Sequence, residues 1–89
     1  METKFAVPLL VWVRPPNGHP VVKSICDVDA GITALTRDGL GSYGVDLPEW
    51  QVALKTLARA KAEPTPETVE AARLALKAVA LRTRSFLDG

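Results

Sequence analysis

Apolar residues fill both sets of alternating positions from Phe5 to Val13, which predicts a β-strand with two apolar faces over Phe5 to Arg14. Such a strand needs packing partners on both of its sides. Pro8 has no N–H group, so we expect either an unpaired stretch of strand edge or a bulge at this position. One face would carry Phe5, Val7, Leu9, Val11 and Val13, and the other would carry Ala6, Pro8, Leu10 and Trp12.

A second strand is predicted from Pro20 to Cys26, after a short segment that contains Asn17 and Gly18. The Asn-Gly pair is the strongest short signal for a β-hairpin, because both residues tolerate positive φ. Prolines on both sides of the pair predict a connection longer than the minimal two residues. The two strands should therefore form an antiparallel hairpin.

A short helix is predicted directly after the second strand. Asp27 has the short carboxylate side chain of a good N-cap, and apolar residues follow it at helical spacing. Gly31 lowers the helix propensity, so the helix should be short. The segment from Gly39 to Gly44 contains three glycines and predicts a flexible connection. The apolar stripe of the helix would be Val28, Ile32 and Leu35.

Two longer helices are predicted in the second half of the chain. The first would begin near Asp46, which has capping-box spacing to Glu49, and would end before Pro64. The second would begin after an N-cap at Thr65 and continue to about Arg84. The short link between them predicts an antiparallel helical hairpin. Their buried residues would be Trp50, Leu54, Leu57 and Ala58, followed by Val69, Ala72, Leu76, Val79, Thr83 and Phe86.

The order of the predicted elements is β-β-α-α-α, which is typical of the α+β class. We expect a two-stranded antiparallel β-hairpin packed on three helices. The 89 residues suffice for a single small domain over residues 1–89. No segment approaches the roughly 20 apolar residues that cross a bilayer, so no membrane contact is expected.

Charge and cysteine content narrow the expected function classes. The formal net charge is +1, whereas dedicated nucleic-acid binders usually carry a clear basic excess. Cys26 is the single cysteine, so the chain cannot form an internal disulfide. A lone cysteine is typical of proteins in a reducing compartment, and we therefore expect a cytoplasmic location.

The sequence offers few groups for catalysis or metal binding. His19 is the single histidine, and a zinc site usually needs three or four ligands. A catalytic cysteine needs a base close to it, and no such base is indicated beside Cys26. We therefore expect His19 to be an exposed turn residue and Cys26 to be a buried structural thiol. Neither an enzymatic activity nor a cofactor is expected.

Exposed apolar residues favour a non-enzymatic interaction module. The predicted helices can cover only one face of the first strand directly, and a second copy of the chain could cover the other. A homodimer or a complex with an unknown protein partner would use Leu10 and Trp12 together with Leu74 and Leu81 on the outer stripe of the last helix. In the alternative, the last helix and the chain ends cover both faces within a monomer.

Basic residues on the two last helices suggest a second function, that of a nucleic-acid-associated regulator. These residues could contact an anionic partner, although such residues often form only a solvated face. Glu67 and Glu70 also reduce the positive charge nearby. The candidate residues are Lys55, Arg59, Arg73 and Lys77.

Four segments resemble a bacterial family, the domain of unknown function nine-eight-two. They are "FAVPLLVWV", "VVKSICDVDAGITAL", "EWQVALKTLARA" and "TPETVEAARLALKAVA", from Phe5 to about Leu81. Members are small single-domain proteins with a hairpin, a short helix and two further helices. The position of Gly31 usually carries alanine in this family. The resemblance implies the same α+β fold and implies no activity, cofactor or catalytic residue.

Overall fold

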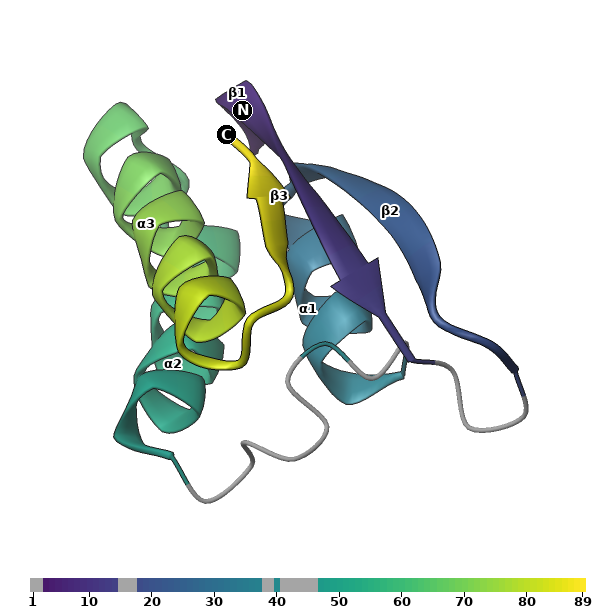
Figure 1. Cartoon of the computed structure of the whole chain (residues 1–89). Coiled ribbons are helices and arrows are strands. Elements are labelled where there is room, and N and C mark those ends of the chain that lie inside the picture. The colour runs from purple at the N-terminus through teal and green to yellow at the C-terminus, as the bar shows by residue number, and fades with distance from the viewer. Residues whose placement is uncertain (1–2, 15–17, 38–39, 41–46) are drawn as a thin grey trace.

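The fold is α+β, with a three-stranded antiparallel sheet and three helices (Figure 1). The computed structural model describes residues 3–14, 18–37, 40 and 47–89. The predicted order of two strands and three helices is confirmed, and a third strand follows the last helix. The elements are β1 (Lys4–Val13), β2 (Val21–Asp27), α1 (Val28–Thr36), α2 (Pro48–Ala62), α3 (Pro66–Arg82) and β3 (Phe86–Asp88).

The sheet has the order β2-β1-β3, so the long apolar strand β1 lies at its centre. The β1–β2 hairpin is confirmed, with Trp12 opposite Val22 and Leu9 opposite Ile25. The register shifts between Lys4 and Leu9, and this irregularity includes Pro8, where an edge gap or a bulge was predicted. The turn residue Asn17 lies outside the described residues.

The helices α1 and α3 pack on one face of the sheet, and α2 packs against these two helices (Figure 1). Leu9, Val11 and Val13 of β1 are buried against them, together with Ile25 of β2. Because successive side chains of a strand point to opposite faces, the residues between them point away from the helices. Among the described residues, β1 is therefore covered by helices on one side only.

Two of the three helix starts follow the predicted capping chemistry. The Asp27 carboxylate accepts a hydrogen bond of 2.7 Å from the Ala30 N–H at the start of α1. At the start of α3, the Thr65 hydroxyl accepts from the Thr68 N–H at 3.1 Å, and the Thr68 hydroxyl accepts from the Thr65 N–H. The N-cap of α2 is Leu47, which makes no side-chain cap hydrogen bond. The predicted cap Asp46 lies outside the described residues.

Two residues of the predicted helical stripes are placed wrongly, Ala58 and Phe86. Ala58 is exposed, because α2 presents Ala53, Leu57 and Ala60 to the core instead. The last helix ends at Arg82, and Phe86 belongs to β3 rather than to the helical stripe. The predicted Gly39–Gly44 connection lies outside the described residues, apart from the buried Leu40.

After α3 the chain reverses direction and continues into β3 of the sheet. The Ser85 N–H donates to the Ala80 carbonyl at 2.7 Å, and the Arg84 N–H donates to the Leu81 carbonyl at 3.3 Å. These are the two hydrogen bonds of a Schellman motif, which needs a left-handed residue at its turn. Arg84 takes that position with φ 57°. Among the described residues, no helix is long and apolar enough to cross a membrane.

Gly31 lies where α1 meets the other two helices. A Cβ atom at Gly31 would be 2.6 Å from Leu76 Cδ1 and 3.0 Å from Leu57 Cδ2. Both leucines are fully buried, so their side chains have little room to move. The glycine that weakens the helix in sequence terms therefore permits the close contact of three helices.

Replacing Gly31 by alanine should destabilise the fold. Alanine gains about 1 kcal/mol of helix propensity, but overpacking of a core costs about 1–3 kcal/mol. We expect urea denaturation to give a free energy of unfolding that is lower by about 1 kcal/mol. Leu76→Val, which removes the clashing methyl group, should cost less in the Gly31→Ala background than alone. An increase in stability for Gly31→Ala would contradict the close contact.

Replacing Arg84 by glycine should stabilise the fold. Glycine adopts positive φ without the steric cost that a side chain imposes. The free energy of unfolding should rise by about 0.5–1 kcal/mol. Arg82→Gly provides the matched control within the last helical turn, and there the same change should lower stability by about 1 kcal/mol. Equal effects of the two substitutions in urea denaturation would contradict this explanation.

Candidate interaction surface

The outer face of the sheet carries exposed apolar side chains from β1 and β2. Trp12 and Leu10 alternate with the buried residues of β1 and are 41% and 37% exposed. Val22, directly opposite Trp12 on β2, is 49% exposed. Leu87 of β3 is 41% exposed and lies at a register shift between β1 and β3, where Asp88 is the partner of Leu10. We call the three residues Leu10, Trp12 and Val22 the open sheet face.

Cys26 is exposed, so the prediction of a buried structural thiol is wrong. Its residue number has the same parity as Val22 and Ser24 on β2, which places it beside the open sheet face. The Cys26 Sγ atom lies 3.5 Å from the Ser24 hydroxyl. His19 precedes β2 and Cys26 lies near its other end, and the stretch of strand from Val21 to Cys26 alone spans about 17 Å at about 3.3 Å per residue. The structure therefore does not bring the thiol and the imidazole together.

Leu74 and Leu81 form a second apolar surface on the outside of α3. They are 50% and 55% exposed, and the exposed Ala71 and Ala78 complete the stripe. This stripe lies opposite the helix face that packs on the core. Since Leu10 and Trp12 point away from the helices, the structure does not bring the four predicted interface residues into one patch.

The four predicted anion-contacting residues are also separated. Lys55 and Arg59 are exposed and line a shallow hollow of about 510 Å³ between α2 and α3, together with Glu67. Lys77 lies on the β3 side of α3, with its Nζ atom 5.1 Å from the centre of the Phe86 ring. Arg73 is only 9% exposed and does not reach the surface lined by Lys55.

Arg73 connects α3 to the end of β3. Its Nε and Nη2 atoms donate to the two Glu70 carboxylate oxygens at 2.9 and 3.0 Å. Its Nη1 atom donates to the main-chain oxygen of Gly89 at 2.7 Å. Hydrogen bonds from Arg73 hold the pKa of Glu70 below its ordinary value, although partial burial opposes this shift. The arginine therefore serves the fold, a role that its helical spacing to Lys77 did not indicate.

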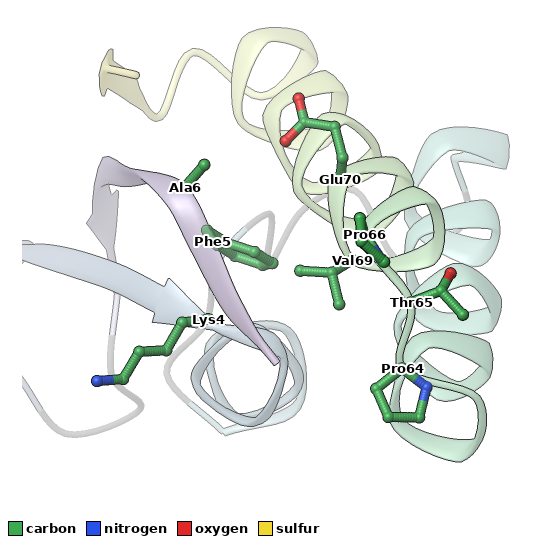
Figure 2. Close-up of a pocket in the computed structure, with 8 residues that line it drawn as sticks. All are labelled: Lys4, Phe5, Ala6, Pro64, Thr65, Pro66, Val69 and Glu70. Carbon is green, nitrogen blue, oxygen red and sulfur yellow. The ribbon is translucent and has the colours of Figure 1, made fainter. Parts of the chain in front are cut away.

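A groove separates the start of β1 from the start of α3, and we call it the β1–α3 hollow (Figure 2). Its volume is about 560 Å³. The Phe5 ring and the Val69 side chain point toward one another across it, and the Lys4 side chain points away (Figure 2). Sequence patterns did not indicate this groove, because its two walls are about 60 residues apart along the chain. The lining residues are Lys4, Phe5, Ala6, Pro64, Thr65, Pro66, Val69 and Glu70.

Neither the metal-ligating side chains of the described residues nor comparison with known proteins indicates what these surfaces bind. Within the described part of the chain, no three histidine, cysteine or acidic side chains come together as a metal site would require. No family model matches the chain, and neither a curated protein nor a solved structure matches it. The resemblance to the nine-eight-two family therefore stays a prediction.

The Glu70–Arg73 pair should give the fold a pH-dependent stability. The folded-state pKa of Glu70 is lowered, so its contribution is complete above the ordinary value of 4.5 and is lost as the pH falls through the lower folded-state value. Wild type should therefore lose more stability than Glu70→Gln between about pH 6 and 3, as measured by urea denaturation. Glu67→Gln, one turn earlier, is the control and should keep the wild-type pH profile. Parallel profiles for wild type and Glu70→Gln would contradict the coupling.

Proposed function

We propose that the protein is a non-enzymatic interaction module that binds a second copy of itself through the open sheet face. The observation that supports this proposal is the exposure of Trp12 and its neighbours on the side of the sheet that no described helix covers. A contiguous exposed apolar patch is typical of a protein–protein contact, and tryptophan is enriched among the residues that dominate binding energy.

The geometry of the face suits a symmetric contact. In a twofold dimer, the same patch of each copy meets its counterpart, so one apolar face is sufficient. Two sheets pack face to face at about 10 Å, with their inner side chains interleaved. Trp12 and Val22 lie directly opposite each other on neighbouring strands, and they would form the centre of such a contact.

The size of the face predicts weak association. A stable dimer buries about 800 Å² of accessible surface on each partner. The accessible surface of the whole protein is 5413 Å². Strand residues that rise about 3.3 Å each, in strands about 4.8 Å apart, give this small sheet a projected area of roughly 300 Å². We therefore expect a concentration-dependent equilibrium between monomer and dimer rather than an obligate dimer.

The helical stripe and the basic residues give less support to a functional contact than the open sheet face does. The stripe with Leu74 and Leu81 is a separate surface, so it is a competing dimer contact rather than part of the same one. Nucleic-acid binding stays the alternative prediction, but Arg73 is paired and buried and is not available to contact phosphates. We expect the module to act in the cytoplasm, since Cys26 is the single cysteine of the chain and has no partner for a disulfide within it.

Trp12→Thr should weaken self-association at least tenfold. Threonine keeps the β propensity of the strand and removes the large apolar side chain. Sedimentation equilibrium from micromolar to millimolar protein would give the dissociation constants of wild type and variant.

The matched control is Leu74→Gln on α3, which should leave the dissociation constant unchanged. A strictly monomeric wild type at millimolar concentration would end the proposal. Loss of the dimer in Leu74→Gln but not in Trp12→Thr would assign the contact to the helical stripe instead.

A further inference from the structure

We infer that the outer side of the α2–α3 helical hairpin binds an amphipathic helix of another protein, with acidic side chains at one end and apolar side chains along the rest. This side has an apolar part and a cationic part, and we call them together the α2–α3 surface. It is separate from the open sheet face, so the inference does not depend on the proposed self-association. Its main residues are Val52, Lys55 and Arg59 of α2 and Leu74, Ala78 and Leu81 of α3.

Val52 of α2 lies beside the apolar stripe of α3. The two helices pack against each other and, with a short link between them, run in opposite directions (Figure 1). At one end of the pair, the Arg82 Nε atom lies 3.8 Å from the Glu49 carboxylate. Val52 comes about one turn after Glu49, so it lies level with Ala78, which comes about one turn before Arg82. The exposed apolar side chains of the two helices therefore form one patch.

The apolar part of the α2–α3 surface has the spacing of a helix-binding site. Val52, Leu74 and Leu81 are 55%, 50% and 55% exposed. Leu74 and Leu81 are two helical turns apart, which is about 10 Å. A helix that lies along α3 presents its own residues i and i+7 at the same spacing, as in other complexes that place a helix in a groove. The exposed Ala71 and Ala78 are small, so such a helix could approach closely between the leucines.

The cationic part continues the patch toward the link between the helices. Lys55 and Arg59 are exposed, lie one turn apart, and line the hollow of about 510 Å³ together with Ala71 of the apolar stripe. Neither cation has an ion pair or a side-chain hydrogen bond among the described residues. Glu67 is the one acidic side chain among the lining residues, so two cations face one carboxylate. The hollow therefore keeps a positive charge that no group of the described chain neutralises.

This charge selects an acidic helix over two other occupants. A second copy presents the same two cations, and the acidic side chain at the other end of its surface, Glu49, already lies beside Arg82. A membrane would contact cations on a flat or outward-curved face, whereas Lys55 and Arg59 line a hollow. Two acidic residues four apart in a ligand helix match the spacing of Lys55 and Arg59. Apolar residues along the next three turns would then cover the stripe of α3.

The test uses the full chain and a fluorescein-labelled, C-terminally amidated peptide with the sequence SEAQAEQALQAQLAQLQA. Its alanines and glutamines favour a helix, its two glutamates lie one turn apart, and its three leucines follow on the same face. Fluorescence anisotropy should show saturable binding, which weakens at least tenfold when the leucines are replaced by serine. Replacement of both glutamates by glutamine should weaken binding about threefold to tenfold at low salt, and less at high salt.

Matched protein variants test the position of the peptide. Leu74→Gln should weaken binding at least tenfold, whereas Leu10→Gln makes the same change on the open sheet face and should not. Lys55→Glu should abolish the preference for the glutamate peptide over the glutamine peptide, whereas Lys4→Glu makes the same charge change on β1 and should preserve it. Trp12→Thr should leave peptide binding unchanged, which separates this inference from the proposed dimer. Circular dichroism would verify that each variant keeps its fold.

Amide chemical shifts in solution locate the bound peptide independently of the variants. The largest shifts should fall between residues 52 and 59 and between residues 71 and 81. Shifts centred on Trp12 would overturn the inference, and so would absence of saturable binding at millimolar protein. Dissociation of a dimer by the peptide would assign the α2–α3 surface to a second copy instead. Tighter binding to phosphatidylserine–phosphatidylcholine vesicles than to the peptide, lost in Leu74→Gln, would assign it to a membrane.

Discussion

Burial of one face of β1 is the interaction on which the rest of this structure depends. Leu9 and Val11 are fully buried and Val13 is 1% exposed, and all three contact the layer of helices. Burial of each such side chain contributes about 1.5–3 kcal/mol, which is a large share of the 5–15 kcal/mol that stabilises a typical domain. The strand also pairs with both other strands, so the sheet cannot form without it.

The helices reach this face because they approach each other closely. Gly31 lets α1 lie against Leu57 of α2 and Leu76 of α3, at distances that a larger residue would prevent. A family pattern with alanine at this position would need a different arrangement of the two leucines. The low helix propensity of glycine is thus offset by packing, which is a tertiary effect.

The proposed contact surface follows from the incomplete cover of β1. Among the described residues, helices pack on one side of the sheet only, which leaves Trp12 exposed on the other. β3 pairs with Leu10 and Val11, and the β1–α3 hollow lies beside the start of the same strand β1. Arg73 holds the end of β3 next to the β1–α3 hollow, because it donates a hydrogen bond to the main-chain oxygen of Gly89. The same short last strand that completes the core therefore defines the limit of the groove.

Local signals in the sequence determined the elements that need only neighbouring residues. Asp27 and Thr65 act as N-caps because their side chains reach backbone N–H groups three residues away, and the β1–β2 hairpin joins strands that are adjacent in the chain. Alternation along β1 also identified Leu10 and Trp12 as one face. The alternation could not show whether that face would be covered, since this depends on which face of the sheet the helices pack against.

Only the tertiary structure decided the features that join distant residues. Phe86 continues a helical pattern in sequence, yet it lies in a strand because the turn at Arg84 returns the chain to the free edge of β1. Arg73 has the helical spacing of a surface residue, yet it is buried, because Gly89 and Glu70 accept its hydrogen bonds. Cys26 is exposed because β2 presents it on the side without helices. In each case the environment comes from a segment far along the chain, and local periodicity carries no information about it.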